Sequence, residues 1–204
     1  MDVATSPKPL QILAVCAAWL TMWLATQGLF VINDYLPGGS LNVRLAWLTG
    51  YVAVVLSVAL VVFRRFGRSF MPRSKLLWLY GVPLALLLAL PFHYSGPVAV
   101  PLLAAMIVIT AFWQDYLSFG LVQTFIGQRT SPLAAVLITG GLFAVGHVVF
   151  LAGQTAPLAF LTACAVYLAA GCLLAWLREQ TRSIYATNAA HLSFLLVFTP
   201  VFSA

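Results

Sequence analysis

Seven long apolar segments, separated by short connections that hold most of the charged residues, run through this sequence from end to end. They cover residues 10–32, 45–63, 76–93, 98–126, 132–152, 156–177 and 185–202. A transmembrane helix needs about 20 mainly apolar residues, and each segment is near or above that length. Only 7% of the 204 residues are charged, against about a quarter in a soluble domain. The pattern predicts an all-α polytopic membrane bundle of about seven transmembrane helices, with residues 1–204 forming a single membrane domain.

The basic residues predict how this bundle is oriented. Cytoplasmic loops carry an excess of Lys and Arg, so we expect the N-terminus in the cytoplasm and the C-terminus outside. This orientation leaves Arg44 outside and assigns a larger set to the cytoplasm: Lys8, Arg64, Arg65, Arg68, Arg73, Lys75, Arg129, Arg178 and Arg182. The net charge of +6 lies between apolar segments and not on a patch with exposed aromatic residues. It therefore indicates the lipid bilayer as a partner and no nucleic acid.

The cysteines and the first apolar segment carry information on location. Cys164 and Cys172 lie about 12 Å apart along one helix, too far for a disulfide, and Cys16 is also in an apolar segment. The segment 10–32 is longer than the core of a cleaved signal peptide, so we expect it to remain as a span. A compact chain of this kind suits an integral membrane protein of a bacterial inner membrane.

Ionisable side chains inside the spans are few, and they are the candidates for function. Each costs about 2.5–3.5 kcal/mol on insertion scales and usually marks a functional site. Asp115 is the one carboxylate within a span, and His147 and His191 are the deep imidazoles. His93 lies beside aromatic residues at the end of a span, which is typical of a membrane interface.

Helical spacing predicts which neighbours share a face with these residues. The expected inward faces are Thr110, Gln114 and Ser118 beside Asp115; Phe143 and His147 below Gly140 and Gly141; and Thr187 and Asn188 with His191. Helical rise from the cytoplasmic ends places Asp115, His147 and His191 at depths of about 16, 22 and 9 Å. They therefore meet only if the helices tilt or shift. The alternative is structural hydrogen bonding between helices, worth about 0.6 kcal/mol per pair.

The order of these motifs resembles that of the CPBP family of intramembrane endopeptidases, which includes the type II CAAX prenyl endopeptidases and bacterial relatives. The family carries E-E-x-x-x-R-G on one helix, F-x-x-x-H on the next and H-x-x-x-N near the end. Aligned on Gly120, the sequence places Phe143 and His147 on the second motif and His191 on the third. The resemblance covers about residues 97–195 and makes this stretch the family-like core.

The first and last motifs depart from the family. Gln114 and Asp115 take the places of the two glutamates, Phe119 that of the arginine and Leu195 that of the last asparagine. In the family the first Glu and the second-motif His are thought to activate water, while the last His and Asn stabilise the oxyanion. An amide cannot act as a base, so Gln114 implies a changed mechanism. The exchanged residues keep the summed charge of the first motif at one negative charge.

The resemblance implies hydrolysis of a peptide bond in a membrane-associated protein or peptide, by water that a carboxylate and a histidine activate. In this interpretation Asp115 replaces the glutamate with His147 as its partner, and His191 donates to the oxyanion with Gln114 or Asn188. The implied catalytic residues are Asp115, His147, His191 and Gln114, with Asn188, Ser118 and Phe143 in support. No cofactor and no metal is expected.

Other functions stay open at this point. Gln114 favours a catalytically inactive pseudoprotease, which would bind a membrane segment or a partner protein without cutting it. Asp115 and the two deep histidines have the right ligand types for a metal-dependent membrane hydrolase, but no short motif such as H-E-x-x-H supports one. The sequence lacks the paired interrupted helices of many transporters, which makes a transporter or channel function a weaker hypothesis. A nucleophilic pair of Cys172 with a histidine is a further hypothesis.

Overall fold

The structure is a computed structural model that describes residues 9–71 and 75–202. Lys8 and Arg73, two of the residues assigned above to the cytoplasm, lie outside the described residues. The long helices are α1 (Pro9–Val31), α2 (Leu41–Val62), α4 (Gly81–His93), α5 (Val100–Asp115), α7 (Pro132–Val148), α8 (Pro157–Thr181) and α9 (Ile184–Phe202). Shorter elements are η1 (Asn33–Tyr35), α3 (Arg64–Gly67), η2 (Lys75–Tyr80), η3 (Tyr116–Val122) and α6 (Gln123–Gly127). The prediction of an all-α polytopic bundle is confirmed.

Seven apolar helical segments form this bundle, and they correspond to the predicted ones. Five are long and apolar enough to cross a membrane, and two, α7 and α9, are shorter apolar helices. The predicted segment 132–152 ends early, at Val148, because turns with Gly153 at φ +75° follow it. The predicted segment 98–126 is one continuous helical run, Val100–Gly127, made of α5, η3 and α6.

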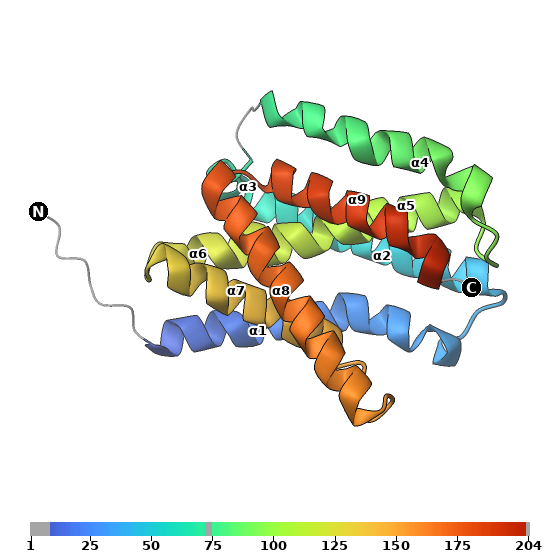
Figure 1. Cartoon of the computed structure of the whole chain (residues 1–204), viewed down its shortest axis with the longest axis horizontal. Coiled ribbons are helices and arrows are strands. Elements are labelled where there is room, and N and C mark those ends of the chain that lie inside the picture. The colour runs from blue at the N-terminus through green and yellow to red at the C-terminus, as the bar shows by residue number, and fades with distance from the viewer. Residues whose placement is uncertain (1–8, 72–74, 203–204) are drawn as a thin grey trace, which may run out of the picture.

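The helices alternate in direction, so that α3, α6 and the turn from α8 to α9 lie at one end of the bundle, on the left in Figure 1. This end carries the described basic residues Arg64, Arg65, Arg68, Lys75, Arg129, Arg178 and Arg182. Arg44, near the start of α2, lies toward the other end. The arrangement agrees with the predicted orientation, which stays a prediction. In the same view α8 crosses the bundle obliquely (Figure 1).

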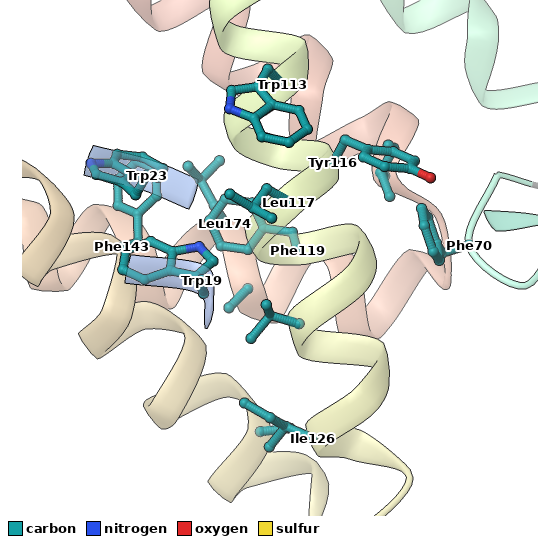
Figure 2. Packing of buried hydrophobic residues seen from close by; sticks show 14 of the residues in the cluster. Trp19, Trp23, Phe70, Trp113, Tyr116, Leu117, Phe119, Ile126, Phe143 and Leu174 are labelled. Carbon is teal, nitrogen blue, oxygen red and sulfur yellow. The ribbon is translucent and has the colours of Figure 1, made fainter. Parts of the chain in front are cut away.

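Helix α1 is held to the rest of the bundle by tryptophan side chains. Trp19 and Trp23 stack with ring centroids 5.0 Å apart and are each 1% exposed. Trp19 Nε1 donates to Ser118 Oγ at 2.9 Å, and Trp23 Nε1 donates to the Gly146 carbonyl at 2.8 Å. Figure 2 shows both indoles beside Phe143 in the main hydrophobic cluster. Because the indole N–H groups are satisfied by η3 and α7, burying them in an apolar interior is not costly.

Helices α7 and α8 pack closely against each other. A Cβ atom placed on Gly140 would lie 2.7 Å from the backbone nitrogen of Cys172, and one on Gly171 would lie 2.7 Å from the Gly140 carbonyl oxygen. A Cβ atom on Gly141 would meet nothing within 4 Å. The predicted close approach is therefore made by Gly140 and Gly171, and Gly141 takes no part in it.

Candidate active site

The site is built around Asp115, the last residue of α5. Its side chain is fully buried, and both carboxylate oxygens accept hydrogen bonds from α9. Asn188 Nδ2 donates to Asp115 Oδ2 at 2.8 Å, and His191 Nδ1 lies 2.9 Å from Asp115 Oδ1. Asn188 and His191 are 2% and 5% exposed. Asn188 and His191 are three residues apart on one helix, so a single face of α9 meets both oxygens of the carboxylate.

A second layer holds this network in place. The Tyr80 hydroxyl, at the end of η2, donates to Asn188 Oδ1 at 2.6 Å. With its amide oxygen occupied in this way, Asn188 turns its NH₂ group toward Asp115. A chain of hydrogen bonds therefore runs from Tyr80 through Asn188 to Asp115 and His191. It joins three segments that are far apart in the sequence.

His147, at the end of α7, lies beside this network in an aromatic pocket. Its Nδ1 atom is 2.8 Å from the carbonyl oxygen of Phe143, one turn earlier in the same helix. Its ring stacks on Tyr167 with centroids 4.6 Å apart and meets the edge of Trp23 at 5.2 Å. Our expectation that His147 would be the partner of Asp115 differs from this geometry, in which His191 holds that place. Nδ1 of His147 instead forms its hydrogen bond with the carbonyl oxygen of Phe143, in the same helix.

Phe143 brings the two imidazoles together. Its ring centroid is 4.3 Å from that of His147 and 5.6 Å from that of His191. In both histidines Nδ1 faces an oxygen that only accepts, so in the neutral ring the lone pair is on Nε2. The site thus combines two imidazoles with fixed tautomers, one of them oriented by a buried carboxylate. A histidine oriented by a carboxylate is one arrangement that can serve general acid–base chemistry.

Thr110, Gln114 and Ser118, the polar residues predicted to lie in a row beside Asp115, have different surroundings. Ser118 lies in η3, where the helix widens to a π-turn, and accepts the hydrogen bond of Trp19. Thr110 donates to the carbonyl of Met106 in its own helix. Gln114 Oε1 is buried without a hydrogen-bond partner among the described residues. Gln114 therefore offers an amide oxygen that a water molecule or a substrate N–H group can bind.

The side chains that could bind a metal ion are not clustered in the described part of the chain. Among the residues that the structure describes, no group of three or more His, Cys, Asp or Glu side chains is placed to hold a metal ion. Cys172 lies at the contact of α8 with Gly140 and is a free thiol. Its Sγ atom would be 2.6 Å from a Cβ atom on that glycine, so its position is explained by helix packing.

An apolar cavity of about 480 Å³ borders the aromatic cluster. It lies between α1, the end of α2 and the run from α5 to α6, and its lining includes Trp19, Trp113 and Leu117. Trp19 lines this cavity, donates to Ser118 and stacks on Trp23, which contacts His147. Two stacked indoles therefore connect the cavity wall to His147, which does not itself line the cavity.

Comparison with known proteins gives one family. The model of the family described as "Rce1-like: Type II CAAX prenyl endopeptidase Rce1-like" matches residues 96–197, half of the chain. The chain belongs to this family. No curated protein and no solved structure matches it. The matched range contains Asp115, His147, Asn188 and His191, and it nearly coincides with the core predicted from the motifs.

The structure describes the surroundings of two residues that the motif comparison above aligns with an arginine and an asparagine of the CPBP motifs. Phe119, aligned there with the arginine, is fully buried and packs on Phe143 with ring centroids 5.4 Å apart. A guanidinium at that place would need a counter-charge in this aromatic cluster. Leu195, at the position of the last asparagine, packs against the apolar cluster of α4, α5 and α9. Asn188, one turn before His191, supplies the amide that contacts Asp115.

Three residues of the site were not predicted from the sequence: Tyr80, Trp23 and Tyr167. A signal was present for Trp23, because Trp19 and Trp23 lie four residues apart deep in a span, away from the interfaces where Trp usually gathers. Tyr80 and Tyr167 are single aromatic residues in apolar segments. Their contacts with Asn188 and His147 depend on helix placement, which the sequence pattern does not specify.

Proposed function

We propose that this integral membrane protein is an intramembrane endopeptidase that hydrolyses a peptide bond of a membrane-associated protein or peptide. The observation that carries the proposal is the buried hydrogen bond of 2.9 Å between Asp115 and His191. A carboxylate at Nδ1 fixes the tautomer of an imidazole and stabilises its protonated form, as the Asp of a Ser-His-Asp triad does. Membership of the Rce1-like family supports this reaction class.

In the proposed reaction, His191 Nε2 takes a proton from a water molecule as the water oxygen attacks the carbonyl carbon of the substrate. The tetrahedral intermediate then collapses, the C–N bond breaks, and the protonated imidazole returns the proton to the leaving amine. Asp115 orients His191, while Asn188 and Tyr80 position Asp115. The lone pair on His147 Nε2 would accept a hydrogen bond from the water, and the NH₂ group of Gln114 would donate to the oxyanion.

The apolar cavity supports the choice of substrate. Its lining is almost entirely hydrophobic, and one lining residue, Trp19, stacks on Trp23, which contacts His147. A lipid-soluble segment would lose little by leaving the bilayer for such a cavity, whereas a soluble polar peptide would lose its hydration.

The excess of basic residues at one end of the bundle supports an orientation in which that end faces the cytoplasm. We propose a bacterial inner membrane as the location of the protein.

The test compares Asp115→Asn with the wild type in a host that lacks the gene, at matched abundance. New protein termini in the membrane fraction are quantified by mass spectrometry. We expect termini that require the wild-type protein to fall by about 10²–10⁴-fold with Asp115→Asn, which is the usual contribution of acid–base groups. Asp34→Asn, on an exposed carboxylate that pairs with Arg44, is the matched control and should leave the termini unchanged. Identical termini with wild type and Asp115→Asn would contradict the proposal.

A second candidate function is a binding protein on a protease fold. Two observations favour it: Gln114 stands at the position of the family glutamate, and both oxygens of Asp115 are already bound by α9. This candidate predicts that Asp115→Asn retains the phenotype and that no new termini depend on the wild type. Co-purification of the same membrane partner with both forms would support it over the protease.

A further inference from the structure

A polar cavity of about 320 Å³ lies at the basic end of the bundle, apart from the site around Asp115. Its lining residues come mainly from α6, the last turn of α8 and the segment after α3. The lining side chains that matter here are Ser69, Gln123, Thr124, Arg178, Glu179 and Arg182. None of them belongs to the proposed hydrolytic site.

Arg178 is the central residue of this cavity. It is only 6% exposed, which is rare for an arginine. Nη2 donates to Thr124 Oγ1 at 3.1 Å, but Nε is buried with no hydrogen-bond partner in the described part of the chain. A buried guanidinium with an unpaired N–H group is costly, so the fold retains a binding capacity that its own residues do not use.

Arg178 has a carboxylate nearby but no direct ion pair in the described residues. The nearby carboxylate of Glu179 contacts Arg182, with Oε1 3.3 Å from Nη2. Within residues 9–71 and 75–202, no carboxylate forms an ion pair with Arg178. The two arginines and one glutamate that line the cavity sum to one positive charge. A single negative charge would neutralise them.

The remaining groups specify the ligand more closely. The hydroxyls of Ser69 and Thr124 can donate hydrogen bonds to an anion. Gln123 is fixed by donation from Nε2 to the Ala175 carbonyl at 2.8 Å, and its buried Oε1 has no hydrogen-bond partner among the residues that the structure describes. A ligand that fits therefore combines one negative charge with at least one O–H donor.

We propose that this cavity binds a monoanionic phosphate group that carries or adjoins a hydroxyl, with Arg178 as its principal ligand. The arginine fork matches phosphate oxygens, and Arg is the usual choice where phosphate is bound in a partly buried place. Two sources have this chemistry: dihydrogen phosphate in the cytoplasm, and an anionic phospholipid with a hydroxylated headgroup. The predicted cytoplasmic interface is the depth at which basic pockets between helices take lipid headgroups.

The experiment uses the full-length protein purified in a neutral detergent. Two probes are titrated separately, inorganic phosphate and short-chain phosphatidylglycerol, each against sodium chloride at matched ionic strength, with short-chain phosphatidylcholine as the neutral lipid. Binding is read from the shift of the unfolding temperature by tryptophan fluorescence and from lipid retention in native mass spectrometry. The variants are Arg178→Gln, Arg182→Gln and Ser69→Ala. Arg65→Gln is the control, because Arg65 is an exposed cation near this end of the bundle that does not line the cavity.

We expect the affinity for at least one phosphate probe to fall about tenfold or more with Arg178→Gln, as for loss of a charge-assisted bidentate contact. A smaller loss is expected with Arg182→Gln and Ser69→Ala, and less than a twofold change with Arg65→Gln. Binding of phosphatidylglycerol alone supports the lipid source, and binding of inorganic phosphate supports the soluble source. If Arg178→Gln does not fold, Arg182→Gln and Ser69→Ala decide. Equal losses in Arg65→Gln and the cavity variants, or no binding of either probe beyond salt and phosphatidylcholine, would overturn the proposal.

Discussion

At the scale of single residues, the site depends on how one buried carboxylate is satisfied. Asp115 accepts from Asn188 and His191, and Asn188 in turn accepts from Tyr80. A buried acceptor that loses its donor incurs the full cost of desolvation, whereas an exposed one is satisfied by water. The network is therefore sensitive at Asn188, which is in contact with both Asp115 and Tyr80.

Replacement of Asn188 by leucine tests this dependence. Leucine is branched at the same atom but is larger and cannot donate to Asp115, so we expect the free energy of unfolding to fall by about 1–3 kcal/mol or more. Unfolding in mixed detergent–SDS micelles would measure the change. Ser193→Ala is the matched control on α9, since Ser193 donates only to the carbonyl of Ala189 in its own helix. If the two variants lose the same small amount, the hydrogen bond to Asp115 contributes little to the fold.

At the scale of the elements, two different kinds of interaction hold the helices together. Helix α1 is attached by hydrogen bonds from indole groups, including that of Trp113, which donates to Thr26 Oγ1 at 2.9 Å. Helices α7 and α8 instead approach closely, because Gly140 and Gly171 leave no side chain between the backbones. Lipid does not drive apolar surfaces together, so hydrogen bonds and close van der Waals contact take over that role.

Adjacent glycines on α7 allow the close approach to be tested. Alanine at Gly140 would force its Cβ atom to 2.7 Å from the backbone nitrogen of Cys172, which cannot move without shifting α8. We expect Gly140→Ala to lower the free energy of unfolding by about 1–3 kcal/mol, the usual cost of overpacking. Gly141→Ala introduces the same group into open space and should leave stability unchanged or raise it slightly. Equal effects of the two substitutions in the same unfolding assay would contradict this account of the interface.

At the scale of the whole molecule, the distribution of basic residues predicts the orientation in the membrane. The described arginines of the α3, α6 and α8 ends gather at one end of the bundle (Figure 1), and Arg44 lies toward the other. Orientation follows the excess of Lys and Arg in short loops, so the end with α3 should face the cytoplasm.

Single cysteines on exposed residues of the two ends would measure this orientation. Arg65 in α3 is exposed, and Tyr35 in η1 is 88% exposed at the opposite end. A membrane-impermeant maleimide added to intact cells should label Tyr35→Cys and should label Arg65→Cys only after the membrane is opened. The wild-type protein, whose described cysteines lie in apolar helices, is the control. The reverse pattern of labelling would show that the bundle is inserted the other way.

The sequence by itself determined the class of fold and the stretch of chain that carries the site. Runs of apolar residues near the length of a bilayer can form little other than spanning helices, because lipid offers no partner for exposed backbone groups. The same scarcity of polar residues made Asp115, His147 and His191 stand out, and the motif around them predicted nearly the range that the family matches.

The tertiary structure alone decided which of these residues meet. Helical rise placed Asp115 and His191 at different depths, yet they form a hydrogen bond of 2.9 Å, while His147 binds its own helix. The wide turn of η3 and the oblique path of α8 lie between these positions in the chain, and apolar periodicity reports neither of them. In a bilayer every face of a helix can be apolar, so the pattern does not fix rotation or depth. Packing at Gly140 and the indole hydrogen bonds of α1 fix them instead.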